Sequence, residues 1–159
     1  MTRTNIIAEP GKQEILITRT FNAPRELVFK MWTDPAYLPE WWGPRGLTII
    51  VDKSDTRKGG IWRYVHRDHN GNEYAHNGVY HEVVSPERLV NTYEFEGVPS
   101  VGLVTTTFEE QPGGRTKLTE TSLYPSVEVR DGVLQSGMTE GAMELMDRFD
   151  ELLAKLQAK

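Results

Sequence analysis

Glu120 is the residue of this sequence best suited to chemistry. It belongs to the strand-like segment Thr116–Leu123, in which alternation places Leu118, Glu120 and Ser122 on one face. A carboxylate that faces an apolar interior has a raised pKa and can serve as an acid, a base or a ligand anchor. We assign no catalytic residue, although Glu120 with His81 is the pair from which a cavity enzyme could work. The alternatives are a structural glutamate paired with His81 and a side chain turned outward by a bulge.

The four histidines lie close together in the sequence: His66, His69, His76 and His81. His66, His69 and Glu73 are of types that bind metals, but they flank Asn70-Gly71, a strong signal for a hairpin turn. The spacing fixes no further ligand, whereas structural zinc sites need four ligands and catalytic sites three. We therefore predict a polar hairpin tip and no metal site.

Several motifs of catalysis and cofactor binding are missing from the sequence. It contains no cysteine, which excludes a disulfide scaffold, a thiolate zinc site and a cysteine nucleophile. G-x-S-x-G, G-x-G-x-x-G and G-x-x-x-x-G-K-[ST] do not occur, so neither a serine hydrolase nor a nucleotide cofactor is indicated. The net charge of −5 argues against binding to nucleic acid. We expect no cofactor.

The sequence also bears on location. Residues 1–11 are polar apart from Ile6, Ile7 and Ala8, and lack the apolar stretch of a signal peptide. No apolar run is long enough to span a membrane. We therefore expect a cytoplasmic protein.

The elements that position these residues follow from turn signals and periodicity. We expect a flexible N-terminal tail over residues 1–11 and one domain over residues 12–159. Segments rich in β-branched residues predict the strands Glu14–Phe21, Leu47–Asp52, Gly60–Arg67, Glu73–Val84, Arg88–Glu96, Val101–Glu110 and Thr116–Leu123. Two short helices are expected after the first strand, over Pro24–Thr33 and Leu38–Trp42.

The C-terminal segment has the period of a long amphipathic helix. Its apolar stripe consists of Met138, Ala142, Leu145, Met146, Phe149, Leu152, Leu153 and Leu156. Residues 126–135 add a further turn of helix. The long stripe must be buried against the sheet, because the chain offers it no other partner. The predicted fold class is α+β, with a curved antiparallel sheet wrapped around the long C-terminal helix.

Strand alternation predicts which side chains line the space between sheet and helix. With Asn70-Gly71 as a two-residue loop, Tyr64 lies opposite Asn77, so Asn77 and His81 face inward. Of the adjacent Trp41 and Trp42, one packs into the core and the other borders the cavity. The expected ligand-binding residues are Trp32, Trp42, Trp62, Tyr64, Asn77, Asn91, Tyr93, Phe95, Met138, Ala142 and Met146.

This predicted lining is unusual for a closed core, because it mixes aromatic rings with Asn77, His81, Asn91 and Glu120. Buried polar groups need hydrogen-bond partners, whereas an aromatic cavity with a few polar groups is typical of a small-molecule site. The alternative is a bulge that shifts the register and turns some polar residues outward.

Several segments carry a resemblance to a known family: Arg19–Phe29, Trp32–Pro35, Glu40–Gly46, Gly78–Val90 and Ser136–Ala142. The chain resembles the START-like (Bet v 1-like, SRPBCC) superfamily, and within it the branch named for the C-terminal domain of the activator of Hsp90 ATPase. The resemblance implies a helix-grip fold, in which a curved antiparallel sheet grips a long C-terminal helix. It also implies that residues 12–159 are a START-like domain that binds hydrophobic ligands.

Three functions are compatible with these observations. The first is a binding protein for a small apolar or aromatic molecule, held between the sheet and the long helix. The second is an Hsp90-related co-chaperone or stress-response protein, whose partner is a chaperone. The third is a cavity enzyme, such as a cyclase or hydrolase, that uses Glu120 with His81. The oligomeric state is left open between monomer and homodimer.

Overall fold

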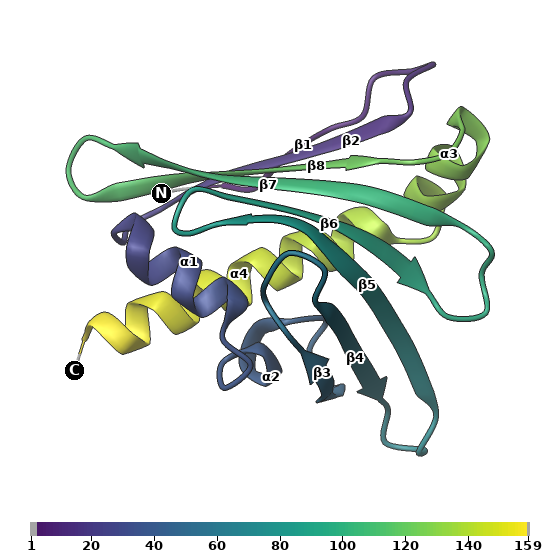
Figure 1. The fold of residues 1–159 in the computed structure, drawn as a ribbon, viewed down its shortest axis with the longest axis horizontal. Helices are drawn as coiled ribbons and strands as arrows, with labels where there is room; N and C mark the ends of the chain where they lie inside the picture. Colours follow the sequence, from purple (N-terminus) through teal and green to yellow (C-terminus); the bar gives the residue numbers. More distant parts are fainter. Residues whose placement is uncertain (1–2, 159) are drawn as a thin grey trace.

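The computed structural model describes residues 3–158, which form one antiparallel sheet that curves around helices on its concave side (Figure 1). The strands are β1 (Asn5–Ile7), β2 (Glu14–Phe21), β3 (Thr48–Ser54), β4 (Ile61–Arg67), β5 (Glu73–Val84), β6 (Arg88–Phe95), β7 (Val101–Gln111) and β8 (Arg115–Leu123). The helices are α1 (Arg25–Thr33), α2 (Leu38–Trp41), α3 (Val127–Gln135) and α4 (Met138–Gln157). The strand order is β1-β2-β8-β7-β6-β5-β4-β3. The predicted α+β helix-grip fold is confirmed.

Alternation along β2 shows how the sheet separates its two faces. Ile15, Ile17, Arg19 and Phe21 are all buried, while the residues between them are partly exposed. A strand with this pattern buries one face and leaves the other in solvent. The buried face is the concave one, because Arg19 reaches α4 from it.

The second half of α4 is tightly held. The Phe149 ring lies 5.1 Å from Phe21, 5.2 Å from Trp32 and 4.8 Å from Trp41, measured between ring centroids. These edge-on contacts join α4 to β2, α1 and α2, and edge-on geometry is favourable for aromatic pairs. Trp32, which we expected in the ligand site, therefore belongs to this closed core.

Two ion pairs add to this packing. The buried Arg19 guanidinium lies 2.6 Å from a carboxylate oxygen of Asp147 and 3.1 Å from one of Asp150. On the same helix, Arg148 donates to the carbonyl oxygens of Gly43 and Glu40 at 2.7 and 2.8 Å. α4 is thus fixed both to β2 and to the loop that follows α2.

The N-terminal segment differs from the expected flexible tail. Residues 5–7 form β1 and pair with β2, with Ile6 opposite Ile17. Arg130 of α3 is only 2% exposed and donates to the carbonyl oxygens of Glu9 and Glu14 at 2.7 and 3.2 Å. The order of this segment comes from pairing and from a distant arginine, neither of which local composition reveals. Residues 1 and 2 of the expected tail lie outside the described residues.

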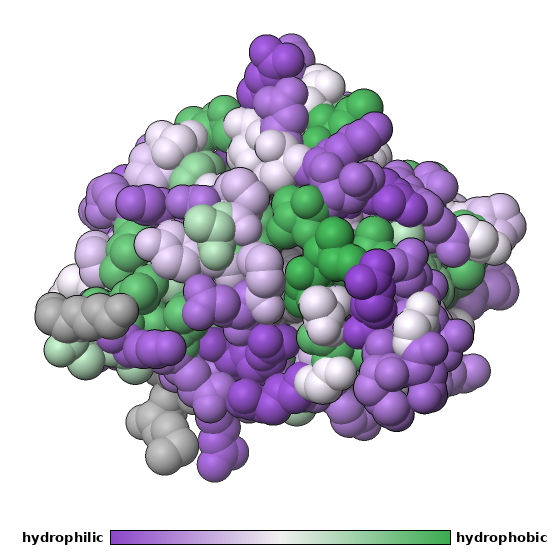
Figure 2. Space-filling view, turned by 90° about the horizontal axis from the view of Figure 1, so that it is seen from below, coloured by the Kyte–Doolittle hydropathy of each residue, from purple (hydrophilic) through white to green (hydrophobic). Residues whose placement is uncertain are grey.

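The helix side of the molecule carries apolar side chains that reach the surface among hydrophilic ones (Figure 2). Within residues 3–158, no helix has the length and apolarity that crossing a membrane requires.

Candidate ligand-binding site

Glu120 lies on the concave face, in the interior of the sheet. β8 runs between β2 and β7, and Glu120 pairs with Ile17 on one side and Thr106 on the other. Ile17 is 2% and Thr106 1% exposed, so the three side chains leave the sheet toward its covered face. Glu120 is nevertheless only half-buried. Part of this side chain therefore remains accessible to solvent.

The Glu120 carboxylate makes no hydrogen bond and no ion pair with any residue in the range 3–158. His81, its proposed partner, is exposed on β5, and β7 and β6 separate that strand from β8. The predicted Glu120–His81 pair is therefore wrong. Burial raises the pKa of Glu120 from 4.5 to about 7, because a carboxylate removed from water favours its neutral form.

Tyr124 lies close to this carboxylate, and Tyr93 lies next to Tyr124. Burial raises the pKa of Tyr124, and the charge of Glu120 raises it further. A Cβ atom placed on Gly102 would lie 3.6 Å from the Tyr124 ring, and Gly102 pairs with Tyr93 across the sheet. Gly102 thus connects the positions of the two rings, which lie on the same part of the face.

The burial of the α4 stripe changes along the helix. Met146, Phe149, Leu152 and Leu153 are buried, whereas the stripe residues before them are only half-buried although they pack against the same core: Met138, Ala142 and Leu145. This first half of α4 begins next to α3 and crosses the concave face (Figure 1). The stripe is therefore covered between Met146 and Leu153, and partly accessible to solvent over Met138, Ala142 and Leu145.

We name this partly accessible region of the concave face the Glu120 site. Its residues come from β6, β8, the segment after β8, and α4: Asn91, Tyr93, Glu120, Tyr124, Met138 and Ala142. Asn91 is half-buried and pairs with Val104, which in turn pairs with Ser122 on β8. Tyr124 was not among the residues we expected, because it follows the last strand and alternation cannot place it.

A second group of inward side chains is closed. Trp62 and Tyr64 of β4 are 4% and 5% exposed, because the Trp42 ring lies edge-on over Tyr64 at 5.0 Å and over His76 at 5.1 Å. Trp41 packs into the core, and its Nε1 donates to the Met31 carbonyl oxygen at 3.2 Å. Of the two adjacent tryptophans, Trp41 therefore lies in the core and Trp42 covers the second group. Met146, which we expected in the ligand site, is part of the core.

His76 and His66 lie within this closed group. The Nδ1 atom of His76 lies 2.6 Å from the Tyr93 hydroxyl oxygen, and the Phe95 ring stacks on His76 at 5.0 Å. The Nε2 atoms of both histidines are buried and lack a partner among the described residues. Burial lowers the pKa of each histidine to about 4, so both rings are neutral at pH 7.

The register between β4 and β5 differs from our expectation by one residue. Tyr64 pairs with His76 instead of Asn77, because the connecting turn is longer than two residues: the Asp68 carboxylate accepts from the backbone N–H groups of Asn70 and Asn72 at 2.9 Å. A slip of one residue exchanges the two faces of a strand. Asn77 therefore lies on the outer face, and its Nδ2 atom donates to Glu96 at 2.9 Å.

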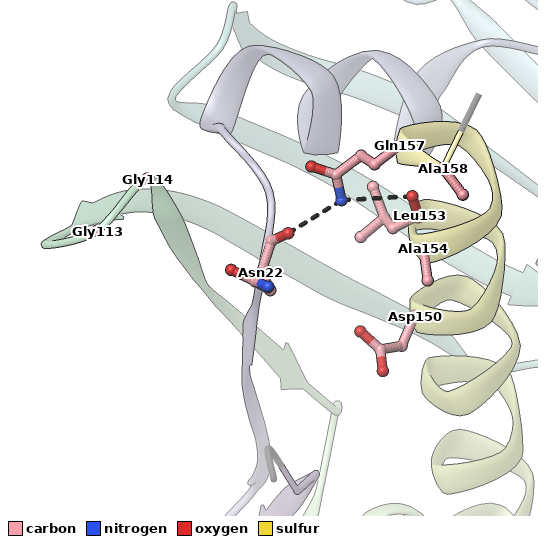
Figure 3. A pocket seen from close by; sticks show the side chains of 8 residues that line it. All are labelled: Asn22, Gly113, Gly114, Asp150, Leu153, Ala154, Gln157 and Ala158. Carbon is pink, nitrogen blue, oxygen red and sulfur yellow. Dashed lines mark hydrogen bonds between the residues drawn. The ribbon is translucent and has the colours of Figure 1, made fainter.

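Two pockets on the surface of the described residues lie elsewhere, and neither involves the predicted residues. The larger, of about 500 Å³, lies at the C-terminal end of α4 and is lined by Asn22, Gly113, Gly114, Asp150, Leu153, Ala154, Gln157 and Ala158 (Figure 3). The Gln157 amide already donates to the Asn22 carbonyl oxygen at 2.9 Å, and Asp150 binds Arg19. The smaller pocket, of about 260 Å³, lies around Arg3 and Lys117.

Comparison with known proteins agrees with this architecture. The family model described as "Activator of Hsp90 ATPase homolog 1-like protein" matches residues 22–154. The chain belongs to this family. It is similar to a solved protein from Rhodobacter sphaeroides, with 29% identity, a TM-score of 0.86, and 96% and 99% of the two chains covered.

Protein Ms6760 from Mycobacterium smegmatis is similar at 28% identity, with a TM-score of 0.84 and 96% and 98% of the chains covered. The fold is also that of the AHSA1 protein from Silicibacter pomeroyi, at 24% identity and a TM-score of 0.71, with 89% and 97% covered. No curated protein matches the chain.

Membership of the activator of Hsp90 ATPase homolog 1-like family defines the fold more closely than the chemistry. In this family member, the described residues contain no group of three or more histidine, cysteine, aspartate and glutamate side chains that could hold a metal. What its concave face offers is an apolar, aromatic surface with one unpaired carboxylate. Such a surface is suited to binding a small molecule.

Proposed function

We propose that this protein binds a small apolar, ring-containing molecule at the Glu120 site, between β6–β8 and the first half of α4. One observation carries the proposal: the apolar stripe of α4 is buried from Met146 to Leu153 but only half-buried before Met146. An apolar stripe that leaves its inner surface partly accessible loses the stabilisation of full burial. A ligand that covers Met138 and Ala142 would supply it.

The composition of the site supports this proposal. Tyr93 and Tyr124 offer ring faces, and Met138 is a flexible side chain that adapts to ligands of different shape. Asn91 and Glu120 supply the few polar groups that orient a ligand in an apolar site. The neighbouring Trp62 and Tyr64 are already covered by Trp42, so they support the site rather than line it.

Nile red, a neutral ring-containing dye whose fluorescence rises in apolar surroundings, provides a direct test. We expect a saturable rise with one dye bound for each chain. Met138→Trp should weaken binding, because the larger side chain fills the site. Met143→Trp is the matched control, since Met143 lies on the same helix but is 42% exposed. Circular dichroism should confirm that both variants keep their helix.

Two results would overturn this proposal. One is the absence of any saturable fluorescence change with the wild-type protein. The other is equal dye binding by the wild-type protein and Met138→Trp, because that result places the dye away from the first half of α4.

A chaperone partner is a second candidate, favoured by the family match over residues 22–154. It would require the cytoplasmic location that we also propose. The test is the rate of ATP hydrolysis by an Hsp90 from the same organism, with and without this protein. An increased rate supports the candidate, and an unchanged rate with no co-purification removes it.

A further inference from the structure

The Glu120 carboxylate, which is half-buried on the concave face, has no positive partner among the described residues. Buried charges are paired in proteins because removing a charge from water is costly. Within residues 3–158 no ion pair reaches Glu120, and the register neighbours Ile17 and Thr106 are an apolar side chain and a neutral one. A ligand with a positive charge could therefore supply the partner that Glu120 lacks.

The cations of the interior are already bound by protein acceptors. Arg19, which faces the same side from β2, is bound by Asp147 and Asp150. Arg130 of α3 donates to backbone carbonyl oxygens, and so does Arg148 of α4. All lysines of the described part of the chain are exposed. Within residues 3–158, none of these cations pairs with Glu120.

The remaining groups on this face are neutral at pH 7. His66 and His76 lie in the closed group and have pKa values of about 4. Burial raises the pKa values of Tyr93 and Tyr124 above those of exposed tyrosines. From α4, the stripe residues opposite the sheet are apolar. Glu120 is therefore the group of this face that titrates near neutral pH.

We propose that the ligand of the Glu120 site carries a basic nitrogen, whose ammonium group binds the Glu120 carboxylate while its apolar body lies under the first half of α4. The proposal rests on the function proposed above and narrows its ligand class. An ammonium group gains a charge-assisted hydrogen bond from the carboxylate and attraction to the tyrosine ring faces. A carboxylic acid ligand would instead meet a carboxylate and find no free cation.

Three probes with the same ring separate these classes: naphthylethylamine, naphthylethanol and naphthylacetic acid. Isothermal titration calorimetry at pH 7 gives their affinities. We expect the amine to bind roughly tenfold or more tightly than the alcohol, the acid being the weakest, because hydrogen bonds to charged groups are the stronger ones. The alcohol measures what the ring alone contributes.

The same titration, repeated in buffers with different heats of ionisation, counts protons. Glu120 with a pKa of about 7 is about half protonated at pH 7. Binding an ammonium ion requires the ionised form, so about half a proton should be released for each amine bound and none for the alcohol. Proton release rising at lower pH and vanishing near pH 9 would match this carboxyl group.

The substitution Glu120→Gln tests whether this carboxylate is the group that binds the ammonium ion. It should remove the preference for the amine and the proton release, while leaving binding of the alcohol within about threefold. Glu109→Gln is the matched control, because Glu109 is an exposed glutamate of β7 and its loss should change neither quantity.

The outcomes separate this inference from the proposed function. Equal affinity for amine and alcohol, tightest binding of the acid, or an amine preference that survives Glu120→Gln would overturn the inference alone. Binding of Nile red without binding of any naphthyl probe would do the same. If Nile red also fails to bind, the proposed function fails and the inference with it.

Discussion

Replacing Glu120 by glutamine should stabilise the protein above neutral pH. The wild-type carboxyl group has a pKa of about 7 in the folded chain against 4.5 when exposed, so the folded state holds more protons between these two values. The free energy of unfolding therefore falls as pH rises from 4.5 to 7, and the full cost of the ionised carboxylate is present above pH 7. At about 1.4 kcal/mol for each pKa unit, that cost is about 3 kcal/mol.

The amide of Glu120→Gln has nearly the same shape and never ionises. The difference in unfolding free energy between variant and wild type should therefore be close to zero near pH 4 and about 3 kcal/mol in favour of the variant near pH 8.5. Urea unfolding followed by tryptophan fluorescence measures both values. Subtracting the wild-type curve removes the contribution of every other titrating group, and Glu109→Gln controls for the loss of one negative charge.

A pH-independent difference would refute this reasoning, because it would mean that Glu120 does not change its protonation state in the folded chain over this range. A wild-type protein that is more stable than the variant at pH 8.5 would also refute it. That result would show that the carboxylate has a stabilising partner in the folded state.

Three further substitutions test the parts that frame the site. His76→Gln should reduce the loss of stability that the protein shows as pH falls from 6.5 to 4. The wild-type histidine has a pKa of about 4 in the folded chain, so its neutral form costs about 3 kcal/mol of unfolding free energy over that range. Thermal unfolding between pH 4 and 6.5 measures the difference. Arg19→Met removes the ion pairs to α4 and should lower stability by about 1–3 kcal/mol in urea at pH 7. Gly78→Ala should either prevent folding or lower the unfolding free energy by about 3 kcal/mol or more, because its Cβ would lie 1.9 Å from the Thr92 carbonyl oxygen. The soluble yield and the urea midpoint test this prediction, and a stable Gly78→Ala protein would contradict the packing described.

Turn chemistry explains why most of the fold could be predicted from the sequence. Glycine and proline pairs separate the strands, and the period of Met138–Gln157 marks the long helix. The extra helix expected over residues 126–135 is α3, which Ser126 caps by accepting from the Val129 N–H at 3.1 Å. β1 was missed because three residues form a strand only when a longer strand pairs with them.

The site was harder to predict, because facing depends on register. The connection between β4 and β5 comprises residues 68–72 instead of the two residues expected, and the resulting one-residue shift in register put His76 in place of Asn77 on the inner face. The signal was present in the sequence: an aspartate two residues before Asn70 favours a turn held by its own side chain. The division of the inner face into a closed part and an accessible part depends on Trp42 and α4, which meet the sheet only in the folded chain.

Glu120 and the two histidines lower the stability of the fold in different pH ranges, and this difference supports a functional role for Glu120. The two buried histidines cost stability only when pH falls below 6.5, so they are silent in a neutral environment. Glu120 is the group whose cost is present at pH 7, and glutamine would avoid it without a change of shape. An unpaired charge that is partly removed from water, without a compensating contact among the described residues, is typical of a functional site. The compensation we propose is the ammonium group of a ligand, which restores the missing pair only when the site is occupied.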